Sequence, residues 1–191
     1  MGIEKLKQLE ILKEQFGTLQ LERAQAKEKV IENVVISGAN DFAKFFREKE
    51  FEVKESKAPY LTPHIQVTRY EVSANFKSLY AILQYSLPAE KLMGTLFRYE
   101  LSMNISKNTK CGILIDSLDR PGPVIVSRMI KDGRDETDEQ MEALKDQIES
   151  YKKRPAPKQE DYGFYIREDN KMPDFSNGYK SIYELLQAII D

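Results

Sequence analysis

The fold of this chain is decided by the stretch FRYELSMNI, residues 97–105. Apolar and polar residues alternate along it, with Phe97, Tyr99, Leu101, Met103 and Ile105 against Arg98, Glu100, Ser102 and Asn104. Because successive side chains of a strand point to opposite faces of a sheet, this pattern predicts a β-strand with one buried and one solvated face.

Further strands are predicted on both sides of this stretch. They cover residues 65–76, 79–87, 111–116, 124–130 and, more briefly, 164–166. Short connections between them favour antiparallel neighbours, and the strands are too closely spaced for a parallel sheet with crossover helices. The apolar positions change phase between Val67 and Tyr70, which predicts a β-bulge near Thr68 or Arg69.

The N-terminal segment predicts a long amphipathic helix from Ile3 to about Val35. Apolar residues recur at a spacing of three and four and form a seam along one side of the helix. Its members are Leu9, Leu12, Phe16, Leu19, Ala26 and Val30. Arg23 and Asn33 interrupt this seam. Charged residues of both signs cover the rest, as on a solvated helix surface. The run Ser-Gly-Ala-Asn at 37–40 predicts a break, followed by a second helix from Asp41 to about residue 50.

Two more helices carry capping boxes at their predicted starts. Thr137 with Gln140 opens one that ends before Pro155, and Ser181 with Glu184 opens the apolar C-terminal helix. The resulting prediction is an α+β fold, with an antiparallel β-meander of about five or six strands packed by helices and a long, coiled-coil-like N-terminal helix. We expect two parts, the helix at 1–36 and the core domain at 37–191.

Composition limits the functional classes. The 191 residues carry 29 basic and 31 acidic side chains, so no global charge attracts nucleic acid or an anionic membrane. The single cysteine, the charged N-terminus and the absence of a long apolar run predict a cytoplasmic protein without signal peptide or membrane span. Frequent Lys, Ile and Tyr with no Trp are typical of an AT-rich genome, such as that of a phage or mobile element.

No catalytic, metal-binding or cofactor motif stands out in the sequence. His64 and Cys111 are too few ligands for zinc and have no spacing that predicts a nucleophile pair. Asp116, Asp119 and Arg120 are typical of a turn before Pro-Gly-Pro, although with His64 they define an enzymatic hypothesis. Phosphate-binding glycine patterns are missing, so no cofactor is predicted and an enzyme is not favoured.

The favoured hypothesis is a non-enzymatic binding, assembly or inhibitor protein. It would act through the N-terminal helix and one sheet face, on a protein partner or on a second copy in a homodimer. The predicted partner-binding residues are Leu9, Leu12, Phe16, Leu19, Arg23 and Val30. The alternative is nucleic-acid binding by the basic, tyrosine-bearing sheet face, through Arg69, Tyr70, Arg98 and Arg128.

Overall fold

The structure is a computed structural model that describes residues 3–62, 65–88, 98–105, 108–118, 136–167, 175–176 and 178–190. The chain divides into two compact units. The first, which we call the helical unit, comprises Met1–Glu28 and Pro121–Pro157, and the second, the sheet unit, comprises Lys29–Arg120 and Lys158–Asp191.

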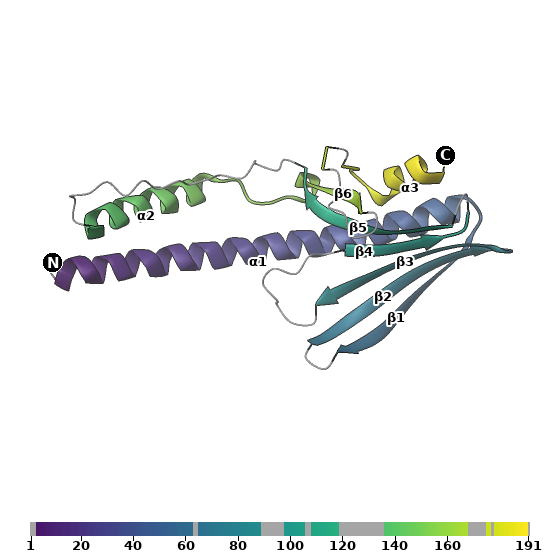
Figure 1. Cartoon of the computed structure of the whole chain (residues 1–191), viewed down its shortest axis with the longest axis horizontal. Helices are drawn as coiled ribbons and strands as arrows, with labels where there is room; N and C mark the ends of the chain where they lie inside the picture. The colour runs from purple at the N-terminus through teal and green to yellow at the C-terminus, as the bar shows by residue number, and fades with distance from the viewer. Residues whose placement is uncertain are drawn as a thin grey trace. The chain divides into compact units, whose positions relative to one another are not determined.

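The described residues form an α+β fold with a six-stranded antiparallel sheet in the order β1-β2-β3-β4-β5-β6 (Figure 1). The elements are α1 (Ile3–Glu48), β1 (Glu52–Thr62), β2 (Ile65–Phe76), β3 (Leu79–Pro88), β4 (Arg98–Met103), β5 (Thr109–Ser117), α2 (Glu136–Lys153), the 3₁₀ turn η1 (Gln159–Asp161), β6 (Tyr162–Arg167) and α3 (Ile182–Ile190). The predicted fold class, including the long N-terminal helix and the meander, is confirmed.

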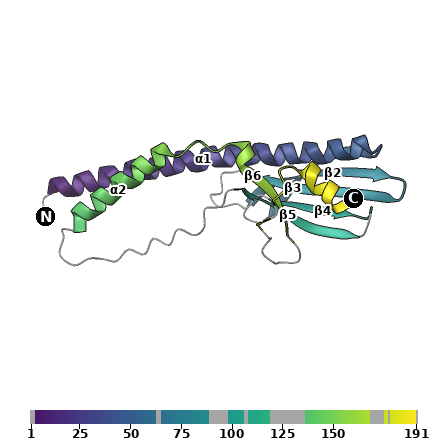
Figure 2. The same ribbon diagram turned by 90° about the horizontal axis from the view of Figure 1, so that it is seen from above.

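One face of the sheet is apolar and carries the core of the sheet unit. The alternation around β4 is confirmed, because Tyr99, Leu101 and Met103 are all buried. The second part of α1 and the short α3 pack on this face (Figures 1 and 2). They contribute the buried side chains Val34, Val35, Phe42, Phe45, Phe46, Ile182, Leu185 and Leu186.

The predicted helix break at residues 37–40 is wrong, because α1 continues unbroken to Glu48. Gly38 allows close packing against the helix and does not form a turn. It is buried in the helix, and a methyl group there would overlap the Tyr99 hydroxyl and crowd Ile182 and Phe164. The space left by the glycine lets the Tyr99 hydroxyl donate a hydrogen bond to the Val35 carbonyl oxygen at 2.6 Å.

The predicted bulge near Thr68 or Arg69 is also wrong. Pairing of β2 with β1 and with β3 passes through both residues in sequence, so the ladder leaves no extra residue there. β1 itself was not predicted as a strand, since its charges and Pro59 are atypical of a sheet interior. It lies at the edge of the sheet, which is a position where a strand tolerates proline.

The remaining helix and strand predictions differ in outcome. The Ser181 hydroxyl accepts a hydrogen bond from the Glu184 backbone N–H at 3.1 Å, which confirms it as the cap of α3. The Glu184 carboxylate accepts from the backbone N–H of Lys180 at 3.0 Å, one residue before the donor expected in a capping box. α2 begins at Glu136, but the Thr137 side chain and the predicted strand 124–130 lie outside the described residues.

The division of the chain into a helix at 1–36 and a core domain at 37–191 stays a prediction.

Two glycines of α1 give a matched test of this packing. We expect Gly38→Ala to lower the free energy of unfolding by about 1–3 kcal/mol, because the new methyl group overfills a packed contact. The methyl group of Gly17→Ala would have no atom within 4 Å. This substitution should raise the free energy of unfolding by up to about 1 kcal/mol, because alanine has the higher helix propensity. Urea unfolding measures both. Tyr99→Phe should relieve part of the Gly38→Ala penalty, and strictly additive losses would contradict the assigned contact.

Burial also makes stability depend on the Tyr99 proton. Desolvation raises the pKa of Tyr99 well above its ordinary value, and Tyr85 and Asp41 add to the rise. The folded state therefore holds this proton more tightly than the unfolded state does. Its contribution to stability is complete below the unfolded pKa of about 10 and is lost as the pH rises toward the folded pKa.

We therefore expect the free energy of unfolding to fall above about pH 10, and to fall less in Tyr99→Phe than in the native chain. Burial likewise raises the pKa values of Tyr85 and Tyr162. The free energy of unfolding of Tyr99→Phe should therefore still fall with pH, but less steeply than that of the native chain. Urea unfolding across this range, with tyrosinate absorbance, measures the effect. Equal slopes in the variant and the native chain would contradict it.

Candidate protein-interaction site

Within the helical unit, α1 and α2 lie side by side and run in the same direction. The Lys5 ammonium contacts the Asp138 carboxylate at 2.6 Å near the start of α2. Further along, the rings of Phe16 and Tyr151 meet edge to face with their centroids 5.2 Å apart. Ile148 of α2 is buried, so this side of the helix is directed at α1.

Arg23 closes the far end of this helix pair. Its guanidinium donates hydrogen bonds to the backbone carbonyl oxygens of Tyr151, Arg154 and Pro155 at 2.9, 3.0 and 2.8 Å. The last carbonyls of a helix lack partners within the helix and carry a partial negative charge. Arg23, which interrupts the apolar seam in the sequence, thus holds the C-terminal end of α2 and the two residues that follow it.

The structure places the six predicted partner-binding residues in two groups. Leu9 is buried in the helical unit, while Leu12, Phe16, Leu19 and Arg23 are half-buried there. Val30 belongs to the sheet unit and packs against its core. Arg23 and Phe16 contact α2 of the same chain, so that helix covers part of the seam. Their role in partner binding stays a prediction.

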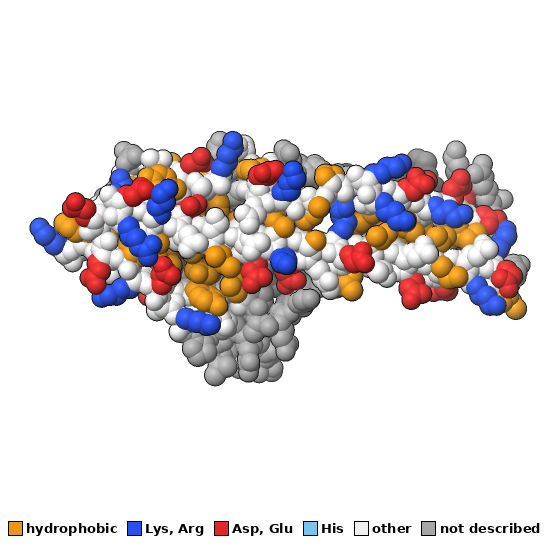
Figure 3. All heavy atoms as spheres, turned by 180° about the vertical axis from the view of Figure 1, so that it is seen from behind, with side chains coloured by type: hydrophobic (Ala, Val, Ile, Leu, Met, Phe, Trp, Pro, Cys, Tyr) orange, Lys and Arg blue, Asp and Glu red, His pale blue; other side chains and the backbone are white. Residues whose placement is uncertain are grey.

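Beside this covered seam lies a groove of about 480 Å³ between α1 and α2. Its lining residues, which we call the groove residues, are Ile11, Glu14, Gln15, Thr18, Leu19 and Glu22 of α1 with Ile148 and Lys152 of α2. Ile11 is 53% exposed although it is a large aliphatic residue. Over the α1–α2 pair, Figure 3 shows hydrophobic side chains flanked by Lys, Arg, Asp and Glu.

The two walls of the groove carry opposite charges. Glu14 and Glu22 stand on α1, and Lys152 stands on α2, where Lys145 precedes it by one heptad on the same side of the helix. Among the described residues, none of these four has an ion-pair partner. The groove therefore presents an acidic wall and a basic wall that the described part of the chain does not neutralise locally.

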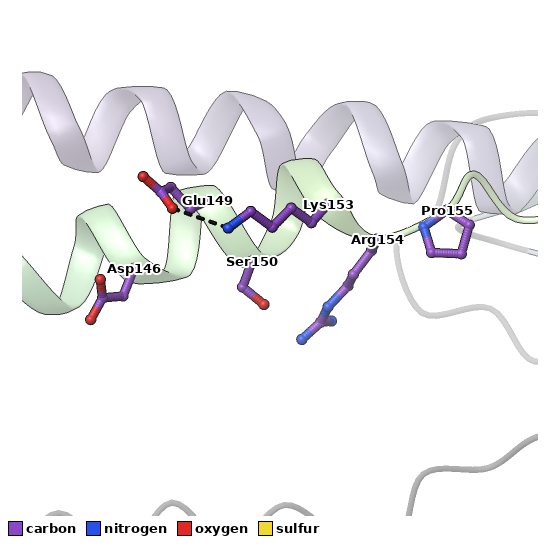
Figure 4. A pocket seen from close by; sticks show the side chains of 6 residues that line it. All are labelled: Asp146, Glu149, Ser150, Lys153, Arg154 and Pro155. Atoms are coloured by element: carbon purple, nitrogen blue, oxygen red, sulfur yellow. Dashed lines mark hydrogen bonds and ion pairs between the residues drawn. The ribbon is translucent and has the colours of Figure 1, made fainter.

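A second hollow lies along α2 and the residues that follow it (Figure 4). Its polar side chains include Glu149 and Lys153, which pair with each other at 3.3 Å. The others, Asp146, Ser150 and Arg154, form no arrangement of nucleophile, base and oxyanion donor in Figure 4. We regard it as a solvated helix surface.

The predicted nucleic-acid residues do not share one surface. Arg69 and Tyr70 are adjacent in β2 and therefore lie on opposite faces of the sheet. Arg69 hydrogen-bonds to Gln84 and contacts Glu100 at 3.4 Å, while Tyr70 stacks on Tyr85 with ring centroids 5.1 Å apart. The Arg98 side chain and all of Arg128 fall outside the described part of the chain.

The enzymatic hypothesis is covered only in part by the described residues. His64, Asp119 and Arg120 lie outside them. Asp116 accepts a hydrogen bond from the Ser117 backbone N–H at 2.8 Å, and Cys111 is buried. Within the described ranges, no group of three His, Cys, Asp or Glu side chains could hold a metal ion.

Comparisons with protein-family models, curated proteins and solved structures find no match to this chain. Searching the described helices for a stretch long and apolar enough to cross a bilayer likewise finds none. The groove residues are therefore interpreted from their geometry alone. Sequence periodicity identified Leu19, but it missed Ile11, which lies outside the apolar seam of the helix.

Arg23 offers a sharp test of the α1–α2 pairing. We expect Arg23→Ala to weaken the docking of α2 by about 1–3 kcal/mol, because three carbonyl oxygens lose a charged donor. Amide hydrogen exchange in α2 measures this loss directly. Arg23→Lys should be intermediate, since an ammonium cannot reproduce the planar fork of guanidinium donors.

A matched control is Arg47→Ala, which removes an exposed ion pair between Arg47 and Glu55 at 3.2 Å. Exposed pairs contribute about 0–1 kcal/mol, so exchange in α2 should stay unchanged. Equal protection of α2 in Arg23→Ala and Arg47→Ala would show that Arg23 does not hold this helix.

Proposed function

We propose that the protein is a non-enzymatic binding protein that captures an amphipathic helix in the α1–α2 groove. The observation that carries the proposal is the exposed Ile11 beside the apolar side chains of Leu19 and Ile148, between two charged walls. Helix-in-groove recognition uses this combination, in which apolar anchors supply affinity and flanking charges supply orientation.

The groove also defines the chemistry of the helix that would fill it. Apolar residues at positions i, i+4 and i+7 would lie over Leu19 and Ile148. Basic side chains would face Glu14 and Glu22, and acidic ones would face Lys152. An adaptor, inhibitor or assembly factor would use such a surface, and we propose that it acts in the cytoplasm because the single cysteine forms no disulfide within the chain.

The outer face of the sheet supports the proposal less strongly. Gln84 bridges two charged neighbours there, donating to the Glu71 carboxylate at 2.6 Å and accepting from Arg69. These side chains already satisfy one another, so a partner would have to replace existing hydrogen bonds. The groove in the helical unit needs no such exchange, and the proposal rests on it.

Selection of a displayed library of amphipathic helices against the full chain tests the groove. We expect the selected helices to bind Ile11→Asp at least about tenfold more weakly, because a carboxylate replaces an apolar anchor; this corresponds to about 1.4 kcal/mol. Isothermal titration with a selected synthetic peptide measures the change.

Leu21→Asp is the matched control, since Leu21 is 48% exposed on the same helix but does not line the groove. It should leave the affinity within about twofold. The proposal fails if no helix is enriched, or if Ile11→Asp and Leu21→Asp weaken binding equally.

A further inference from the structure

We infer that the groove is filled by α1 and α2 of a second copy of this chain, so that two helical units form a parallel four-helix bundle. This inference rests on the proposed function and names the partner for the same surface. Its first support is that the described residues of each helical unit form two helices side by side, with Ile11 still half exposed. A second pair would cover that apolar surface from the open side.

Charge complementarity selects the arrangement of the two copies. A two-fold axis parallel to the helices would place α1 of one copy over α2 of the other, with Glu14 and Glu22 facing Lys145 and Lys152. A two-fold axis across the helices would place α1 over α1 and set glutamate against glutamate. Only the first arrangement pairs the acidic wall with the basic wall.

The axial positions of the charges agree with this pairing. Because Lys5 lies beside Asp138 and Phe16 beside Tyr151, Lys145 lies near the level of Ile11, and Lys152 near that of Thr18. Glu14 of a second copy would then fall between the two lysines, about 5 Å along the axis from each at 1.5 Å per residue. Long side chains span such an offset.

Glu22 and Ile11 fit the same register. Glu22 of the second copy would lie about four residues, or about 6 Å, beyond Lys152, within the reach of a lysine. Ile11 of that copy would lie within about one helical turn of Ile148, so the exposed aliphatic side chain would be buried against an apolar one. The charges and the apolar residues therefore select the same parallel pairing.

Charge reversal tests the inference on the full chain. In Glu14→Lys/Glu22→Lys, and in Lys145→Glu/Lys152→Glu, the facing walls carry like charges, and we expect the homodimer dissociation constant to rise at least about 100-fold. An equimolar mixture of the two double variants should recover a dimer, because the walls are again complementary. Sedimentation equilibrium measures the masses, and far-UV circular dichroism confirms that each variant keeps its helices.

The control variant is Glu10→Lys/Glu28→Lys, which makes the same change of charge on α1. These two residues are 18 positions apart, or five helical turns, and neither lines the groove. The native chain and this control should both sediment as dimers. Ile11→Asp should sediment as a monomer.

Three outcomes overturn the inference. The first is a native chain that is monomeric at about 100 µM, because the interface would then be too weak to persist. A native dimer that both charge-reversed variants retain places the interface elsewhere. If the two double variants are both folded and their mixture forms no dimer, the proposed pairing of the acidic wall with the basic wall is wrong. If the native chain is monomeric and selected helices still bind the groove, the proposed function stands; if neither associates, both fail.

Discussion

The hydroxyl of Tyr99 donates its hydrogen bond to the Val35 carbonyl oxygen across the gap left by Gly38, and the sheet unit is organised around this contact. Tyr99 stands in a central strand and is fully buried. A buried phenol without a partner would be costly, so the hydrogen bond fixes both the rotation of α1 and its position along the sheet. Phe164 and Ile182 close around the same glycine, which ties β6 and α3 to the contact.

The contact also extends sideways through the sheet. Lys57, Tyr70, Tyr85 and Tyr99 are direct partners across four neighbouring strands. The centroids of the Tyr85 and Tyr99 rings are 5.8 Å apart, and the Tyr85 ring also stacks on that of Tyr70. The Lys57 ammonium lies over the Tyr70 ring. Cross-strand aromatic pairs stabilise a sheet and define its register. One row of side chains therefore connects the helix contact to the edge strand.

Sequence patterns predicted the features that depend on neighbours in the chain. The alternation around Tyr99 identified the central strand, and Ser181 was recognised as a cap. Gly38 was misinterpreted, because a glycine that ends a helix and one that admits a distant side chain look alike locally. Arg23 was misread for the same reason, since its carbonyl partners lie 128 to 132 residues away. In the candidate site, the seam was visible by spacing, but Ile11 becomes a groove residue only once α2 is placed beside α1.

The two edges of the sheet bear on how the protein behaves at high concentration. An open strand edge is a template on which further chains can add and grow into fibrils. The sequence of the edge strand β1 includes Lys54, Lys57 and Pro59, residue types that discourage such addition. At the other edge, Phe164 of β6 already exchanges backbone hydrogen bonds with Tyr179 at 2.8 and 2.9 Å. Strand-by-strand addition is thereby disfavoured at both edges of the sheet.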